Sequence, residues 1–158
     1  MTTMLAVPRP FTQTDVGPAS ALVLNALGAT AYLERARELL TATAAGDPEC
    51  RALVLQHESS LQSLAVFGPV AGASNVWRIR LLLLASDAAP REIGRAMVGA
   101  VLDRVREAGG RLLTAELPAD PAIGSALTAL RSTGFRQDAR VPDFFRDGVA
   151  LLFFSKEL

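Results

Sequence analysis

A continuous apolar stretch near the middle of the chain constrains the fold more than any other feature. Residues 81 to 85 are four leucines and an alanine, with no polar residue between them. A strand of this composition is buried on both faces, as in a mainly parallel sheet that helices cover on both sides. Because the stretch is too short to cross a membrane, we expect it to be the central strand of a globular α/β domain.

The residues that follow this stretch predict a long helix. The stretch ends at Ser86 and Asp87, and Pro90 suits the first position of a helix because it lacks an N–H and has a fixed φ. Apolar residues then recur at helical spacing, at Ile93, Met97, Val101 and Val105. The helix therefore has one face suited to packing against the sheet.

Two glycines and a second apolar segment complete a strand–helix–strand unit. Gly109 and Gly110 are suited to end the helix, and residues 112 to 117 form another apolar strand. Such a crossover is right-handed and makes its two strands parallel. The N-terminus of the helix then lies at the carboxyl end of the first strand, where unpaired N–H groups and the helix dipole favour an anion, typically phosphate.

The composition limits the classes of protein to consider. A chain of 158 residues that is 50% hydrophobic and 20% charged is typical of one globular domain, so we expect residues 1–158 to form a single domain. It has 16 basic and 16 acidic residues, and this balance favours neither nucleic acid nor an anionic membrane as a partner. Residues 1 to 11 do not resemble a signal peptide, so we expect a cytoplasmic protein.

The counts of cysteine and histidine restrict the chemistry. Cys50 is the only cysteine and His57 the only histidine, which excludes an internal disulfide and a thiolate zinc site. They also exclude a Ser-His-Asp or Cys-His catalytic group within the chain unless His57 supplies the base. We therefore expect no metal, with Cys50 packed in the interior and His57 on a surface hairpin.

The segments on either side of the central unit also have recognisable elements. The N-terminal part predicts an edge strand and two helices at residues 7–11, 15–27 and 31–44, followed by an antiparallel hairpin at 51–56 and 61–70. The C-terminal part predicts a helix that starts at Asp120 and Pro121 and ends at Gly134. A strand, a turn and a last strand follow at 135–141, 142–148 and 149–155.

This order of elements, together with two short motifs, resembles the Gcn5-related N-acetyltransferases (GNAT). Arg91, Gly94 and Ala96 match the spacing of that family's acyl-CoA signature, which is Gln or Arg, two residues, Gly, one residue, and Gly or Ala. The Gly134–Phe135 pair and the segment 140–148 resemble a second family pattern at the right distance. The resemblance implies an α/β (α+β) GNAT acyl-CoA N-acyltransferase fold, with a central mixed sheet of about seven strands and about four helices.

The resemblance also implies where acetyl-CoA binds. In this family the cofactor lies where the central strand and the next parallel strand diverge, here expected beyond Leu84. Pantetheine amides pair with the exposed backbone of the first strand, here Leu82, Leu83 and Leu84. The pyrophosphate meets the N–H groups at the start of the helix, here Arg91, Glu92, Ile93, Gly94, Arg95 and Ala96. A backbone N–H near Leu84 stabilises the oxyanion of the reaction.

The sequence departs from the family pattern at two points. In an alternative alignment anchored on residues 93–96, Glu92 replaces the first glycine and Ala89 the usual Gln or Arg. A carboxylate there repels a pyrophosphate, which Arg91 and Arg95 are placed to offset. Leu130 occupies the position of the usual general-acid tyrosine, and the only tyrosine, Tyr32, is far away in sequence. Because a thiol of pKa about 8.5 leaves acceptably as thiolate, this predicts slow or atypical turnover.

From these features we expect an N-acetyltransferase that transfers an acetyl group directly from acetyl-CoA to a primary amine of an unidentified acceptor. Glu116 is the best candidate for the general base, with Glu58 and Asp143 weaker. The first two helices and the segment 142–148 would select the acceptor. The alternative is a catalytically impaired GNAT-fold protein that binds acyl-CoA or a protein partner without efficient turnover. A homodimer formed through the closing strand, residues 149–154, is also expected by resemblance.

Overall fold

The computed structural model describes residues 7–85 and 89–158. Ser86 and Asp87, where the sequence predicts the end of the central strand, lie outside the described residues. Seven strands form one mixed sheet in the order β1–β2–β3–β4–β5–β7–β6. They are β1 (Arg9–Pro10), β2 (Arg51–His57), β3 (Ser60–Pro69), β4 (Val76–Leu84), β5 (Leu112–Pro118), β6 (Arg136–Arg146) and β7 (Val149–Glu157).

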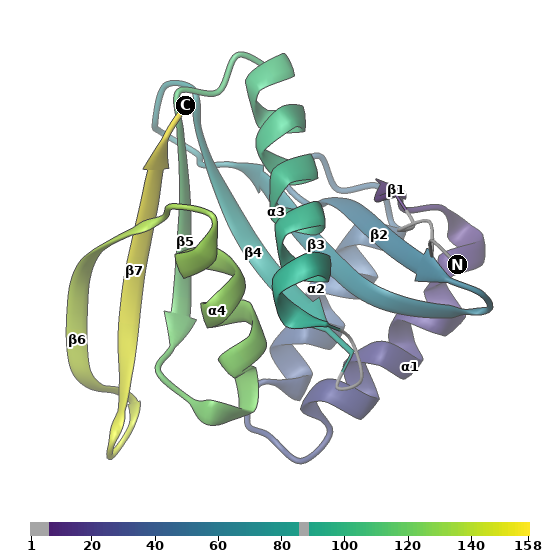
Figure 1. Ribbon diagram of the computed structural model, residues 1–158, viewed down its shortest axis with the longest axis horizontal. Coiled ribbons are helices and arrows are strands. Elements are labelled where there is room, and N and C mark those ends of the chain that lie inside the picture. The colour runs from purple at the N-terminus through teal and green to yellow at the C-terminus, as the bar shows by residue number, and fades with distance from the viewer. Residues whose placement is uncertain (1–6, 86–88) are drawn as a thin grey trace.

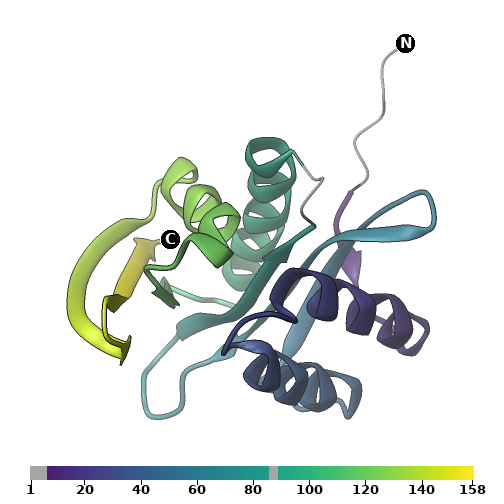
Figure 2. The ribbon, with the colours of Figure 1, turned by 90° about the horizontal axis from the view of Figure 1, so that it is seen from below.

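Four α-helices cover the two faces of this sheet. They are α1 (Val16–Leu27), α2 (Leu33–Ala44), α3 (Pro90–Glu107) and α4 (Gly124–Ser132), with short 3-10 helices at Gln13–Asp15 and Pro121–Ile123. Helices α3 and α4 lie together on one face, and α1 and α2 lie on the other (Figures 1 and 2). The expected fold class, a mixed sheet with four helices, is confirmed. Within the described residues, no helix is both long and apolar enough to cross a membrane.

Strand β4 contributes to the hydrophobic core on both faces of the sheet. Leu82 and Leu84 belong to the core beneath α3 and α4, which is built around Met97 and Val101. Leu83 points the other way and belongs to the core beneath α1 and α2. The strand buried on both faces that the leucine run predicts is therefore confirmed. The mainly parallel sheet expected with it is wrong, because among the described strands β4 and β5 pair in parallel and the other five pairs of neighbours are antiparallel.

Strands β4 and β5 separate earlier than the sequence suggests. They pair in parallel only through residues 76–79 and 112–115. Beyond this point β4 continues along β3, whereas β5 continues along β7 as far as Pro118. The expectation that the strands diverge beyond Leu84 is thus wrong: the divergence begins after Ile79. As a result, the last five residues of β4 border a gap in the sheet.

The expected turn at 142–148 is wrong, because most of this segment is strand. β6 runs through to Arg146, and the reversal is confined to Asp147 and Gly148. Pro142 is tolerated because β6 is an edge strand. A bulge accommodates the extra length: Asp143 adopts a positive φ of 53°, and its Oδ1 accepts a hydrogen bond from the Gly148 N–H at 2.8 Å.

The closing strand cannot form backbone pairs with a second chain, whereas its packing against a second chain across a two-fold axis stays a prediction. β7 lies between β5 and β6, so both of its edges already carry backbone hydrogen bonds. The two ends of the sheet are β1 and β6. Two other boundaries also move slightly: α2 begins at Leu33 instead of residue 31, and β1 is limited to Arg9 and Pro10.

A buried carboxylate joins β1 to the start of α1. Asp15 is 3% exposed, and its two oxygens accept hydrogen bonds from two nitrogens of Arg9 at 2.8 Å each. The backbone N–H of Thr12 donates to the same carboxylate at 2.8 Å. Hydrogen bonding from Arg9 holds the pKa of Asp15 below its usual value, although burial opposes this.

This arrangement predicts a pH-dependent contribution to stability. Because the folded-state pKa lies below the unfolded one, the stabilisation is present above pH ~4 and is lost as pH falls through the folded pKa. At pH 7, Asp15→Asn is expected to lower the free energy of unfolding by about 1–3 kcal/mol. Urea unfolding at pH 7 and pH 3 measures the difference, with exposed Asp103→Asn as the control. A loss of equal size at both pH values would contradict the assignment.

Candidate active site

Three adjoining pockets that share lining residues follow the gap between β4 and β5, and together they are called here the cleft. Its opening, called here the mouth, lies between the N-terminal end of α3 and α4 and is lined by residues 89, 91, 92, 124, 125 and 128. The next part, the channel, is lined by Leu82–Leu84, by residues 25–27 of α1, and by residues 122, 123, 125 and 126. The inner cavity lies beyond it, between α1, α2 and the diverging strands. Ser125 lines both the mouth and the channel, and Ile123 lines both the channel and the inner cavity.

The backbone of β4 presents polar groups to this cleft. On the other side of the strand, the Ala85 N–H donates to the Gln62 carbonyl at 2.8 Å, and the Ser63 hydroxyl donates to the Leu83 carbonyl at 2.7 Å. The backbone N–H and C=O groups of successive strand residues point to opposite neighbouring strands. The backbone groups of Leu83 therefore point to β3, whereas those of Leu82 and Leu84 point into the gap. The Leu84 N–H is therefore a hydrogen-bond donor directed into the channel.

Among the described residues that line the inner cavity, Glu116 is the only acidic one. Its side chain is 41% exposed, and its nearest ion-pair contact, Arg78 Nη2 to Glu116 Oε1, is long at 3.9 Å. The two weaker candidates lie elsewhere. Glu58 is in the turn between β2 and β3, and Asp143 hydrogen-bonds its own hairpin. The geometry thus places one carboxylate where it can meet a ligand in the inner cavity.

Comparison with solved structures identifies this architecture. A protein from Desulfovibrio desulfuricans assigned to the GNAT family of acetyltransferases superposes with a TM-score of 0.80 at 19% identity, covering 96% of this chain and 98% of that one. The ribosomal-protein-alanine N-acetyltransferase of Brucella melitensis gives a TM-score of 0.76 at 22% identity, covering 96% and 99% of the two chains. The chain has the GNAT fold.

A third similar structure contains a ligand. This protein, from Salmonella typhimurium, was solved with its cofactor acetyl-CoA and gives a TM-score of 0.76 at 16% identity, covering 97% of this chain and 94% of that one. The sequence matches no protein-family model and no curated protein. The comparison of structures therefore identifies the fold where the comparison of sequences finds no match. It confirms the predicted resemblance to the GNAT fold.

In this GNAT fold, the first turn of α3 has fewer open N–H groups than expected. The helix begins at Pro90, which has no N–H, and the Ile93 N–H already donates to the Ala89 carbonyl at 2.9 Å. The N–H groups of the later residues lie within the helix, so the open donors in this turn belong to Arg91 and Glu92. This favours the alignment in which Glu92 stands at the first glycine, and the exposed side chains of both residues line the mouth.

Gly94 has a structural role that the signature did not suggest. A Cβ placed on this residue would lie 2.6 Å from the Cβ of Ala129, which is closer than atoms can approach. Gly94 is buried where α3 crosses α4, so it allows the two helices to come close together. A substitution at Gly94 therefore reports on helix packing as well as on any phosphate nearby.

A matched pair of substitutions in α3 tests this packing role. Gly94→Ala is expected to lower the free energy of unfolding by about 1–3 kcal/mol, because the added methyl group overpacks the contact with α4. Gly99→Ala, where nothing lies within 4 Å of the new Cβ, is expected to raise it by about 0.5–1 kcal/mol. Urea unfolding compares the two variants. The packing role would be refuted if both substitutions stabilised the protein equally.

A polar network that sequence reasoning missed joins three distant segments beside the inner cavity. The Tyr32 hydroxyl donates to Asp120 Oδ2 at 2.7 Å and accepts from Arg146 Nη1 at 3.1 Å. Arg146 Nη2 also donates to Asp120 Oδ2 at 2.8 Å. Asp120 in addition caps the 3-10 helix by accepting from the Ala122 N–H at 2.9 Å, which confirms its predicted capping role. The network fixes the α1–α2 connection to the β6–β7 hairpin.

The electrostatics of this network favour a charged Asp120 and a neutral Tyr32. Hydrogen bonding from Tyr32, together with the Ala122 N–H and Arg146, holds the pKa of Asp120 below its usual value. Burial raises the pKa of Tyr32, and its bond to Asp120 raises it further. The network is neutral in total, since one carboxylate meets one guanidinium. In the sequence, the only signal for this network is the residue type at three loop ends, which are aromatic, acidic and basic.

Leu130 occupies the position where the family resemblance leads one to expect a tyrosine. It is fully buried in the core beneath α3 and α4. The phenol beside the cleft belongs instead to Tyr32, which lines the inner cavity with Glu116 and Phe145. A residue set aside because of its distance in sequence therefore lies in the wall of the candidate site.

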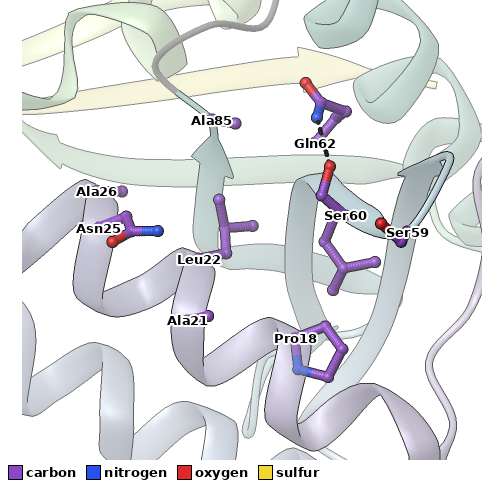
Figure 3. A pocket seen from close by; sticks show the side chains of 10 residues that line it. Pro18, Ala21, Leu22, Asn25, Ala26, Ser59, Ser60, Gln62 and Ala85 are labelled. Carbon is purple, nitrogen blue, oxygen red and sulfur yellow. Dashed lines mark hydrogen bonds between the residues drawn. The ribbon is translucent and has the colours of Figure 1, made fainter.

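A further pocket lies between α1 and the turn that joins β2 to β3 (Figure 3). Asn25, Ser59, Ser60 and Gln62 give it a polar but uncharged lining, and Gln62 Nε2 donates to Ser60 Oγ at 3.2 Å. Ala21 lies on the α1 side of this pocket. It shares Asn25 and Ala26 with the channel but no residue with the mouth or the inner cavity, and Ala21 lines none of the three parts of the cleft.

Proposed function

We propose that this protein is an N-acetyltransferase that transfers an acetyl group from acetyl-CoA directly to a primary amine. The observation that carries the proposal is the gap between β4 and β5, where the backbone of Leu82 and Leu84 faces a channel that leads to Glu116. The acetyl-CoA bound to the similar Salmonella typhimurium structure supports the same cofactor here. The whole cleft lies within one chain.

In this proposal the cofactor threads through the cleft from the mouth. The pyrophosphate lies against the first turn of α3, residues 91 to 96, where the open N–H groups of Arg91 and Glu92 meet it. The pantetheine amides pair with the backbone of β4 at Leu82 and Leu84. The thioester carbonyl then lies at the inner end of the channel, near the Leu82 N–H, because Leu82 lines both the channel and the inner cavity whereas Leu84 lines the channel alone. We therefore propose that the Leu82 N–H, instead of the expected one of Leu84, stabilises the oxyanion that forms during transfer.

The transfer itself requires one proton acceptor. The neutral amine attacks the thioester carbonyl, forming a C–N bond, and Glu116 takes the proton that the nitrogen loses, directly or through water. The C–S bond then breaks, and CoA leaves as the thiolate. Because Leu130 supplies no acid, the thiolate takes its proton from water, and we propose that turnover is slower than with an acid in place.

The alternative function is binding of acyl-CoA without efficient turnover. Two features favour it: the apolar Leu130 at the family's acid position, and the exposed Glu92 carboxylate at the mouth. The carboxylate repels a pyrophosphate, although Arg91 beside it offsets the charge. This alternative predicts saturable binding of acetyl-CoA with no acetylated product from any amine.

The direct test is a transfer assay with acetyl-CoA and a panel of primary amines. Appearance of free thiol that depends on both enzyme and amine, with the acetylated amine identified by mass spectrometry, is the expected result. Free thiol without acetylated amine would mean hydrolysis of the thioester. If saturating acetyl-CoA gave no product from any amine, the transferase assignment would be abandoned in favour of binding alone.

A further inference from the structure

The inner cavity has the size and lining of a site for an apolar group. Its volume is about 290 Å³, and eleven of its fifteen lining residues are apolar, contributed mainly by α1, α2, β4 and β5. For comparison, a cavity of about 150 Å³ lined by Leu, Ile and Phe binds benzene. The inner cavity therefore has room for one ring and a short chain attached to it.

The charges around the inner cavity are not suited to an anion. The two arginines in its wall are already paired with acids that do not line it. Arg35 Nη1 donates to Glu38 Oε2 at 3.1 Å, and Arg80 Nη2 lies 3.7 Å from Glu49 Oε2 while its Nε donates to the Glu49 carbonyl. Glu116 has the longest ion-pair contact of the three charged residues in the wall, at 3.9 Å to Arg78. The amine must lie near Glu116, so a carboxylate on the carbon that bears the amine would also lie near this acidic group and be repelled by it.

One wall of the cavity presents aromatic rings. Phe145 packs edge-on against Tyr32, with ring centroids 6.1 Å apart. The Tyr32 hydroxyl is engaged by Asp120 and Arg146, so Tyr32 offers its ring to the cavity while its polar end is satisfied elsewhere. Arg146 is held in the same way by Asp120. The network therefore removes the polar groups that would otherwise compete for an apolar ligand.

From the volume, the lining and the charge together, we infer that the acceptor is a primary amine on an apolar body the size of one ring, without a carboxylate. This inference rests on the proposed function. The ring would occupy the inner cavity against Tyr32 and Phe145, and the amine would lie toward Glu116. The amine then forms its C–N bond with the acetyl carbon, loses one proton to Glu116, and displaces CoA as the thiolate.

Three small amines test this inference, because ethylamine and phenylalanine each differ from phenethylamine by a single feature. Phenethylamine carries the ring and no carboxylate, ethylamine lacks the ring, and phenylalanine adds a carboxylate to the same body. At saturating acetyl-CoA, we expect kcat/KM for phenethylamine to exceed that for each of the others by about 10- to 100-fold. Equal values, or a preference for ethylamine or phenylalanine, would overturn the inference.

A matched pair of variants locates the amine. Ala31 is exposed and lines the inner cavity, so Ala31→Phe is expected to raise KM for phenethylamine about 10-fold with little effect on ethylamine. Ala21 is also exposed but lies in the pocket of Figure 3, so Ala21→Phe is expected to change neither. Equal effects of the two variants on phenethylamine would contradict the placement.

Calorimetric titration with acetyl-CoA distinguishes a wrong acceptor class from a wrong proposed function. If acetyl-CoA binds and the order of the amines differs from that expected, the acceptor class is wrong while the proposed function stands. If acetyl-CoA does not bind, the proposed function fails, and the acceptor class fails with it.

Discussion

Replacing Glu116 by Gln is expected to lower kcat for acetyl transfer by about 10²- to 10⁴-fold. The amide keeps the size of the side chain but accepts no proton from the attacking amine. Glu116 lines the inner cavity and does not line the channel or the mouth, so the affinity for acetyl-CoA should not change. Steady-state kinetics with phenethylamine or another active amine, together with calorimetry for the cofactor, measures both quantities.

A second carboxylate provides the control for this experiment. Glu58 is exposed in the turn between β2 and β3 and does not line the cleft, so Glu58→Gln should retain full activity. The substitutions are chemically identical and differ only in their position relative to the cavity. Full activity of Glu116→Gln over the whole pH range would mean that water, and not this carboxylate, takes the proton.

Filling the channel is expected to abolish the binding of acetyl-CoA. Ala122 is exposed at the channel wall opposite Leu82 and Leu84, and the channel volume is about 260 Å³. The indole of Ala122→Trp would occupy much of the space that the pantetheine arm requires. We expect the dissociation constant for acetyl-CoA to rise by about 100-fold or more, a loss of about 2.7 kcal/mol.

The fold should tolerate this substitution. The structural role of Ala122 is its backbone N–H, which donates to Asp120 Oδ1 whatever the side chain. Arg131→Trp adds the same indole to the exposed side of α4, outside all three parts of the cleft, and should leave binding unchanged. Equal urea midpoints for the two variants would exclude unfolding as the cause. Undiminished affinity in Ala122→Trp would place the cofactor somewhere other than the channel.

The elements that the sequence predicts well are those with local signals. The run of leucines locates β4 because a strand that is buried on both faces has apolar residues at successive positions. Gly109 ends α3 and has a positive φ of 81°, as a helix-terminating glycine should. Asp120 accepts from the Ala122 N–H as a capping residue does. Each of these signals lies within a few residues of the structure that it determines.

The features that the sequence does not predict depend on contacts between distant segments. The point at which β4 leaves β5 is set by pairing with β3 on one side and β7 on the other, so no local pattern marks it. Tyr32 meets Asp120 and Arg146 across separations of 88 and 114 residues. The extension of β6 through Pro142 likewise depends on its position at the sheet edge. Such contacts become visible only once the strand order is known.

Calorimetric titration of the purified protein with acetyl-CoA and, in parallel, with free CoA would show whether the gap between β4 and β5 holds the cofactor. We expect saturable binding with a dissociation constant on the order of micromolar, the range in which enzymes commonly bind their substrates. Absence of binding of either ligand at millimolar concentration would contradict it, because the open backbone of Leu82 and Leu84 would then lack its proposed partner.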